Sequence, residues 1–423
     1  MRSFAVPLVL ALSGGAVSAQ IPGPAVTGLL ADPRFQQARA FIKTDHERFV
    51  RELVTLTEIP APPFKEERRA RAYLEMLKVH GLSDVEMDQE GNVMGVRKGT
   101  GGAPMLAVLA HLDTVFPEGT DVKVRREGTR LMAPGVGDDT RGLVLMLSVI
   151  RAMNAGKLTT AGDVLFVGNV GEEGEGDLRG VKFLLQRGKY KDRIKRFLAI
   201  DGGDQGGITR AGVGSKRYRV TYKGPGGHSY GAFGLVNPAY AMATAIARLS
   251  DLQVPSSPKT TFNVGVVSGG TSVNSIPSEV SMDVDMRSES CAELKKVDGA
   301  FLEIVQGSVA DENRARSTRE GRIQVDPKVI GERPCGETSM EAPILRTTVA
   351  VVQGFGLKPA FSVSSTDSNI PMSMGIPALT IGRGGPGGRS HSPDEWTDVE
   401  AEGVAKSIEV ALAIILAVAR DSM

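Results

Sequence analysis

The sequence predicts an α/β fold: a mixed, mostly parallel sheet with helices on both faces, into which a smaller α+β unit is inserted. Short apolar runs alternate with segments of helical periodicity along most of the chain, for example at 105–110, 164–170 and 197–200. That alternation is typical of a largely parallel sheet. After about residue 213 the strand-like segments alternate polar and apolar residues, as half-exposed strands do. The apolar pattern then returns near the C-terminus.

Length and composition limit the class of protein. At 423 residues the chain exceeds one ordinary domain, and we expect two. We place the main domain at 20–213 and 327–423, and the inserted unit at 214–326. Lys and Arg total 50 against 49 Asp and Glu, so no basic field would attract nucleic acid. An apolar share of 41% and a charged share of 23% indicate a soluble globular protein.

The first nineteen residues have the pattern of a secretory signal peptide. A short positive start, Met1-Arg2-Ser3, precedes the apolar run 4–12, and Val17-Ser18-Ala19 offers the small residues of a cleavage site. We expect cleavage after Ala19 and an exported protein, periplasmic or secreted. An uncleaved membrane anchor or a buried strand is the alternative. No later segment reaches the ~18 apolar residues of a membrane span.

The main domain begins with helices. Residues 20–30 are rich in Pro, Gly and Ala, and we expect them to be extended. Apolar residues at helical spacing predict one helix over 35–59, stopped by the prolines that follow, and a second over 64–80. Between the apolar strands the same spacing predicts helices at 141–153 and 180–186.

The inserted unit mixes strands and helices. Alternating segments predict strands at 216–222, 261–267 and 280–286, with 322–325 as a closing strand, and two helices lie between them, at 237–249 and 292–305. The main domain resumes with a helix at 342–352, a strand at 377–381 and a helix at 399–418.

The only cysteines are Cys291 and Cys335, and neither lies in a C-x-x-C motif. In an exported protein they could form one disulfide. Two buried free thiols are an equal alternative.

Two of the five histidines lie in segments that suit a metal site. They are His111 and His391, and between them the chain carries several carboxylates, most of them at or just past an apolar strand: Asp138-Asp139, Glu172-Glu173 and Asp201. Open α/β sheets bind ligands at the carboxyl ends of their strands. Two imidazoles and at least three carboxylates at that edge suit a pair of divalent metals, which can activate water for hydrolysis.

Local sequence patterns predict roles for some of these residues. Asp113 lies two residues beyond His111 on the same side of a strand, where its carboxylate could orient that imidazole. Of the adjacent acids Glu172 and Glu173, one could bind metal while the other exchanges a proton with the attacking water. A solvated acidic turn is the alternative there. For Asp139, a helix N-cap is the favoured reading.

Taken together, these motifs resemble those of a known enzyme family. The segment Ala110-His111-Leu112-Asp113-Thr114-Val115, with Gly137-Asp138-Asp139, Glu172-Glu173, Asp201 and His391, resembles the ligand set of the co-catalytic di-zinc exopeptidases. That family includes glutamate carboxypeptidase, peptidase T, dipeptidases, carnosinase, aminoacylase and succinyl-diaminopimelate desuccinylase. The resemblance runs from about residue 35 to the C-terminus. The Asp138-Asp139 pair makes it closest in motif to peptidase T-like members.

The resemblance implies a role for each of these residues. His111 and Asp201 would hold one zinc, Glu173 and His391 the other, and Asp138 would bridge the two. Glu172 would be the general base and acid, and Asp113 would orient His111. Co²⁺ or Mn²⁺ could replace zinc in such a ligand set.

The resemblance also identifies the inserted unit as a lid and dimerisation domain. His228 would reach the site of a neighbouring subunit and stabilise the oxyanion, so we expect a homodimer. Asn274 and Arg287 match positions that bind the carbonyl or carboxylate of the substrate. Independently of the resemblance, Arg389 lies in a Gly-rich loop beside His391 and is a candidate substrate anchor.

The expected function is that of a zinc-dependent exopeptidase that hydrolyses terminal peptide bonds of small peptides. In the family, Asp at the position of Asp201 goes with peptidases and Glu more often with deacylases. An N-acyl amino acid amidohydrolase with the same chemistry is the alternative, and a catalytically silent peptide-binding member is a third reading. Side-chain preference and the polarity of attack are left open by the sequence.

Overall fold

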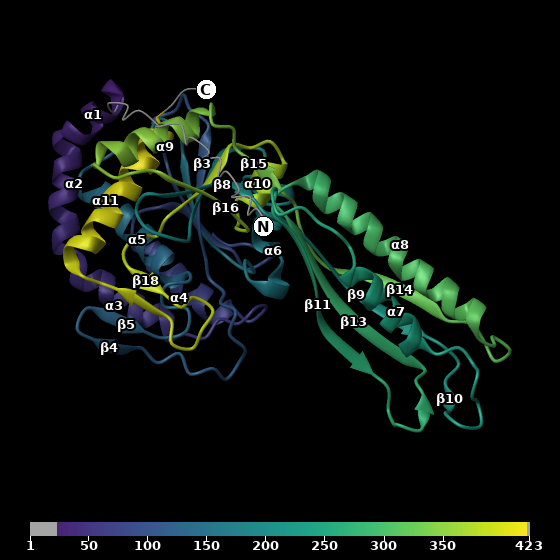
Figure 1. The fold of residues 1–423 in the computed structure, drawn as a ribbon. Helices are drawn as coiled ribbons and strands as arrows, with labels where there is room; N and C mark the ends of the chain where they lie inside the picture. Colours follow the sequence, from purple (N-terminus) through teal and green to yellow (C-terminus); the bar gives the residue numbers. More distant parts are fainter. Residues whose placement is uncertain (1–22, 421–423) are drawn as a thin grey trace, which may run out of the picture.

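The computed structural model describes residues 23–420, so the expected signal peptide lies outside the described part of the chain. Figure 1 shows a layered α/β body from which a slender unit of strands and two helices projects to one side. The predicted fold class is confirmed: the large sheet is mixed and mainly parallel at its centre, and a separate antiparallel sheet belongs to the inserted unit.

The main sheet has nine strands in the order β1-β2-β6-β3-β7-β17-β8-β15, with β16 paired to β8. β6, β3, β7 and β17 run parallel to one another, whereas β1, β2, β8 and β15 add antiparallel pairs at the two sides. The strand bounds are β1 Ser83–Met87, β2 Val93–Arg97, β3 Met105–His111, β6 Val164–Asn169, β7 Ile194–Ile200, β8 Gly207–Gly212, β15 Gly336–Glu337, β16 Ala360–Ser364 and β17 Ala378–Ile381.

Helices cover both faces of this sheet because its central strands are apolar on both sides. On β3, Leu106 and Val108 belong to one buried cluster, and Ala107 and Leu109 belong to another. The first cluster includes side chains of α1–α5, α9 and α11, and the second includes those of α6 and α10. The helix bounds are α1 Pro24–Ala31, α2 Pro33–Thr44, α3 His46–Thr57, α4 Glu67–Lys78, α5 Thr140–Ala155, α6 Arg179–Gln186, α9 Pro343–Gly354, α10 Asn369–Ser373 and α11 Ala401–Val418.

The N-terminal segment corrects one expectation. Residues 20–30 were expected to be extended, but α1 begins at Pro24. Proline fits the first turn of a helix because its fixed φ is helical and its missing N–H has no partner there. Val26 and Leu29, three residues apart, are both buried, and that burial stabilises this short helix against the body. The single helix expected over 35–59 is two helices, with Asp45 between them.

The inserted unit is a four-stranded antiparallel sheet in the order β11-β13-β9-β14, backed by two helices. Its strands are β9 Gly214–Lys223, β11 Thr260–Gly269, β13 Glu279–Ser288 and β14 Gln324–Arg333, and its helices are α7 Pro238–Ser250 and α8 Cys291–Ala315. Burial alternates strictly along β13, since its even-numbered side chains from Val280 face the helices. β14 continues to Arg333, beyond the limit of 326 that we assigned to the unit.

Cys291 and Cys335 form a disulfide, which the sequence left open. It joins the start of α8 to the segment that returns from β14 to the main sheet. The described helices include none with both the length and the apolar character that crossing a bilayer requires.

Candidate metal centre

The candidate residues lie at one edge of the main sheet. β3 ends at His111, Glu172 and Glu173 follow β6, and Asp201 follows β7 directly. His391 lies farther along the chain from β17, in the loop between β18 Gly387–Gly388 and β19 Trp396–Asp398. Because β3, β6, β7 and β17 are parallel, their carboxyl ends meet at the same edge.

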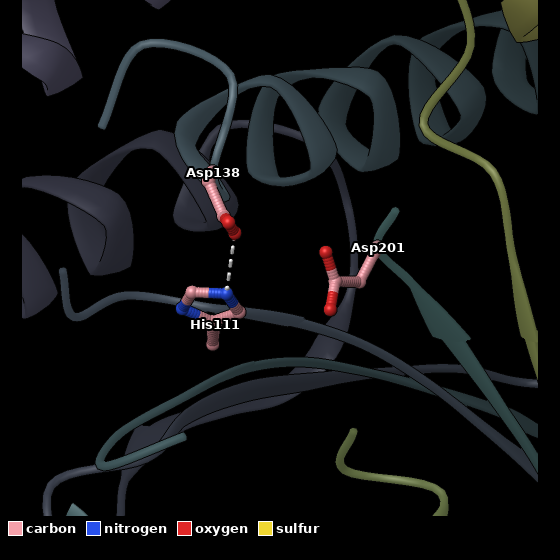
Figure 2. Close-up of side chains that lie close together, drawn as sticks. All are labelled: His111, Asp138 and Asp201. Carbon is pink, nitrogen blue, oxygen red and sulfur yellow. Dashed lines mark hydrogen bonds and ion pairs between the residues drawn. The ribbon is translucent and has the colours of Figure 1, made fainter. Parts of the chain in front are cut away.

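The side chains converge as two overlapping groups of three that share Asp138. His111, Asp138 and Asp201 offer ligand atoms within 4.8 Å of one another, and so do Asp138, Glu173 and His391. Figure 2 shows the first group with its three side chains turned toward a common point. One oxygen of Asp138 lies 3.2 Å from His111 Nε2, and the other lies 3.3 Å from His391 Nε2. This is the arrangement that a carboxylate bridging two cations needs.

The donor set fits two divalent cations. Each group offers one imidazole nitrogen and two carboxylates, and such nitrogen and oxygen donors suit zinc or a similar transition metal. The identity of the metal ligands stays a prediction, which the convergence of the five side chains supports.

Glu172 and Glu173 diverge from adjacent positions in the chain. Glu173 Oε1 lies 2.9 Å from His391 Nε2. Glu172 instead accepts a hydrogen bond of 3.1 Å from Arg333. Both side chains are buried, which excludes the solvated acidic turn. Glu172 and Glu173 also form a third group with His111, so the Glu172 carboxylate remains beside the cluster.

Asp113 contacts His111 differently from the expectation. The ring Nδ1 lies 3.0 Å from the Asp113 carbonyl oxygen but 3.6 Å from its carboxylate. The carboxylate instead accepts hydrogen bonds from the backbone N–H groups of Glu172, at 3.0 Å, and Glu173, at 2.7 Å. Asp113 therefore fixes the ring through its backbone and the Glu172–Glu173 loop through its side chain.

The loop before α5 is held by an acid that the sequence analysis missed. Glu395 accepts hydrogen bonds from the N–H groups of Gly135, Gly137 and Asp138 at 2.7–2.9 Å. A Cβ at Gly137 would lie 2.9 Å from Glu395 Oε1, so only glycine permits this approach. No spacing rule points to Glu395, because it is separated from this loop by most of the chain.

The N-cap role favoured for Asp139 is wrong. Asp139 occupies the N-cap position of α5, but its side chain makes no capping hydrogen bond. One carboxylate oxygen accepts from the backbone N–H of His111 at 3.2 Å, and the side chain is fully buried. Burial raises the pKa of Asp139 well above its ordinary value. Asp139 thus holds the backbone at the end of β3, where His111 lies.

The electric field of the cluster favours positive charge. Hydrogen bonds to Asp138 and Glu173 raise the pKa of His391 to about 10. Burial opposes ionisation of Asp138, but the Arg383 guanidinium and the two imidazoles outweigh it and hold the Asp138 pKa well below its usual range. Burial raises the pKa of Glu172 well above the ordinary value, although the charge of Arg333 opposes the rise. A site with this field attracts cations.

Three further polar side chains border the cluster without a sequence signal. Arg333 comes from the end of β14, Arg383 follows β17, and Asp367 is buried beside Asn169, which donates a hydrogen bond of 2.8 Å to it. Burial raises the pKa of Asp367 to about 7. A single arginine or acid has no periodicity that could have identified it.

The substrate-binding candidates lie in different places. Arg287 lines the same cleft as the cluster, a space of about 1000 Å³ that is also lined by Glu172, Asp201 and His391. Asn274 and His228 instead line a separate hollow beside β10 Gly227–His228, which Figure 1 places at the far tip of the inserted unit. Arg389 pairs with Asp394 and is largely exposed.

The sequence is similar to those of known peptidases. Residues 107–417 match the model of peptidase family M20/M25/M40. Carboxypeptidase G2 of a Pseudomonas strain is 25% identical over 199 residues, which are 46% of this chain and 47% of that protein. The chain thus aligns with about half the length of this relative.

Solved structures share the fold over most of the chain. Aminopeptidase PepT from Bacillus cereus has a TM-score of 0.70 at 22% identity, with 89% of this chain and 99% of that chain covered. The YXEP protein of Bacillus subtilis, a dinuclear metal-binding peptidase of the M20 family, has a TM-score of 0.65 at 18% identity with the same coverage.

The family match covers most of the sequence and includes every residue of the two triads. The resemblance drawn from the sequence is therefore confirmed, and the chain belongs to peptidase family M20/M25/M40 as a metal-dependent hydrolase.

Proposed function

We propose that this protein is an exopeptidase that hydrolyses terminal peptide bonds of small peptides with two zinc ions. The observation that carries the proposal is the shared carboxylate of Asp138, whose two oxygens face different imidazoles. His111 and Asp201 would hold one zinc, and Glu173 and His391 the other. Bound zinc ions supply Lewis acidity, which lowers the pKa of a water molecule and polarises the scissile carbonyl.

Glu172 is the residue of this chain that moves the proton. Its carboxylate lies in the group with His111 and Glu173, yet it is a member of neither triad that shares Asp138. We assign it as the general base that takes a proton from the attacking water and then delivers it to the leaving amine. Arg333 holds Oε1 of this carboxylate.

A second copy of the chain would complete the site. His228 is exposed at the tip of the inserted unit, where its Nδ1 accepts from the N–H groups of Tyr230 and Gly231 at 3.3 Å. Its other ring nitrogen is then the donor. In a homodimer this donor would reach the cleft of the partner and stabilise the oxyanion, a contribution of roughly 3–4 kcal/mol for groups of this kind.

The cleft suits a substrate with a carboxylate. Arg217 and Arg287 of the inserted unit line it together with the metal cluster. A peptide C-terminus and an N-acyl amino acid both carry such a group, so the amidohydrolase alternative shares this support. The aspartate at position 201 favours the peptidase. The N-terminal pattern favours an exported protein, and a periplasmic or secreted enzyme would meet such peptides.

A substrate panel tests the proposal. The protein is stripped with a chelator, reloaded with Zn²⁺, Co²⁺ or Mn²⁺, and given dipeptides, tripeptides and N-acyl amino acids, with products identified by mass spectrometry. We expect cleavage at one end of the peptides that chelator abolishes and metal restores. Hydrolysis of N-acyl amino acids alone would select the alternative. A metal-loaded protein that hydrolyses no member of the panel would contradict both.

A further inference from the structure

An arginine contacts two carboxylates of the candidate metal centre. Arg383 follows β17 by two residues, and its Nη1 lies 2.7 Å from Asp201 Oδ1 and 3.2 Å from Asp138 Oδ1. Its Nη2 donates to Ser390 Oγ at 3.3 Å. The side chain is only 13% exposed. One guanidinium thus joins both acids of the triad that contains His111.

The contact fixes how Asp201 presents its oxygens. Oδ1 accepts from Arg383 and from the backbone N–H of Gly202. Oδ2 takes part in no hydrogen bond with the described residues 23–420, which leaves it as the oxygen available to a cation. Without the guanidinium, the Asp201 carboxylate could rotate about its Cβ–Cγ bond.

The position of Arg383 is itself fixed. Its carbonyl oxygen accepts from the guanidinium of Arg141 at 3.3 Å. On either side of it, Gly382 N–H donates to Gly207 and Gly384 N–H to Gly203, each at 3.2 Å. Backbone contacts therefore anchor the loop on both sides of the side chain, and an arginine remains charged at any physiological pH.

We propose that Arg383 is a positioning residue of the metal centre: it holds Asp138 and Asp201 in the orientation in which they bind the cation at His111. The inference rests on the proposed function, because it takes these residues as ligands. Partners that hydrogen-bond to metal-binding carboxylates orient them, and their loss typically costs 10–100-fold in metal affinity.

Replacing Arg383 has two opposing effects on metal affinity. Removing a positive charge strengthens the attraction of the site for a cation. It also removes the donor that holds Asp138 and Asp201, so that one of these carboxylates can turn away from the position of the cation. A carboxylate that has turned away is lost as a ligand. We expect the second effect to dominate, so that metal affinity falls.

A measurement of metal affinity shows which of the two effects dominates when Arg383 is replaced. Zinc binding to the stripped protein is measured by competition with a chromophoric chelator for the wild type and for Arg383→Met. We expect one of the two sites to weaken by about 10–100-fold. The matched control is Arg219→Met, which removes an exposed arginine paired with Asp283 on the inserted unit. Its zinc affinity should equal that of the wild type.

The absorption spectrum of bound Co²⁺ supplies a second measurement. A general loss of stability would leave this spectrum unchanged, whereas displaced ligands would alter it. The visible absorption of bound Co²⁺ reports the number and geometry of its ligands. We expect an altered spectrum for Arg383→Met and an unchanged one for Arg219→Met. Weaker binding with an unaltered spectrum would mean that the arrangement of the ligands does not depend on Arg383, and it would overturn the positioning role.

A second variant guards against misfolding. Arg383→Gln keeps an N–H donor for one carboxylate, and its fold is checked by circular dichroism and thermal unfolding. A loss of affinity together with an altered cobalt spectrum in either folded variant supports the inference, and unchanged or tighter binding overturns it. If the wild type itself binds no metal, the proposed function fails. If it binds two metals and hydrolyses peptides while the variants bind equally well, only the inference fails.

Discussion

Arg333 Nη1 lies 3.1 Å from Glu172 Oε1, and the two side chains are each only 6% exposed. Arg333 is the last residue of β14 in the inserted unit, whereas Glu172 belongs to the main domain. Arg333 also donates to the carbonyl oxygen of Glu172. The proposed base is therefore held by a side chain of the inserted unit, so the placement of that unit also determines the placement of the base.

Glu172→Gln should remove turnover while sparing the metal. The glutamine carbonyl can still accept from Arg333, so the loop keeps its position, but the side chain no longer exchanges a proton. We expect kcat to fall by about 10²–10⁴-fold, with zinc content unchanged by elemental analysis. Glu175→Gln, at an exposed acid of the same loop, is the control and should retain activity. Near-full turnover of Glu172→Gln with both metals bound would refute the base assignment.

Asp113→Asn should destabilise the Glu172–Glu173 loop. The carboxylate accepts from two buried N–H groups, and an asparagine can accept from only one while its amide nitrogen faces the other. We expect the free energy of unfolding to fall by about 1.5–3 kcal/mol, measured by urea denaturation of the metal-free protein. An unchanged midpoint would mean that these hydrogen bonds do not support the loop.

Mixing two inactive variants tests whether the site is shared between subunits. Glu172→Gln lacks the proposed base and His228→Ala lacks the proposed oxyanion donor. In a mixed dimer one site receives both intact residues, so subunit exchange should restore part of the activity. The measurement compares the rate of the mixture with the sum of the separate rates. If subunits exchange but the mixture is no faster than the sum of the separate rates, His228 acts within its own chain.

His80 should make stability depend on pH. Burial lowers its pKa from 6.5 to about 4, and its Nε2 has no hydrogen-bond partner among residues 23–420. Since the unfolded state takes up this proton at higher pH than the folded state, stability is complete above about 6.5 and is lost as pH falls toward 4. The loss is at most about 3 kcal/mol. His80→Phe should remove that part of the pH dependence of the free energy of unfolding.

Denaturation of both proteins at several pH values, with chelator present, measures the difference. Other groups titrate in the same range, but they do so equally in the wild type and the variant. Parallel stability curves for the two proteins would show that His80 does not titrate differently on folding.

The sequence predicts those parts of the fold and site that follow from local pattern. The central strands are continuous apolar runs, and the candidate ligands His111 and Asp201 lie at their carboxyl ends. Parallel pairing then brings together side chains that are distant in the chain. By contrast, β8 is only partly buried and all of β16 is exposed, so neither is a continuous apolar run that would mark it as a strand.

The residues that surround the cluster could not be predicted. Arg333 reaches Glu172 only because β14 extends to the edge of the main domain, and Glu395 reaches the loop at Gly137 across most of the sequence. Which oxygen or N–H a carboxylate contacts depends on backbone geometry at the level of single bonds. The same reason accounts for the wrong N-cap role of Asp139 and for the second contact of Asp113.

Anomalous diffraction from a crystal grown with zinc tests the central claim most directly. The account predicts two anomalous peaks about 3.5–4 Å apart, with one oxygen of Asp138 on each, His111 and Asp201 on the first and Glu173 and His391 on the second. A single peak, or two peaks that do not share Asp138, would contradict the account.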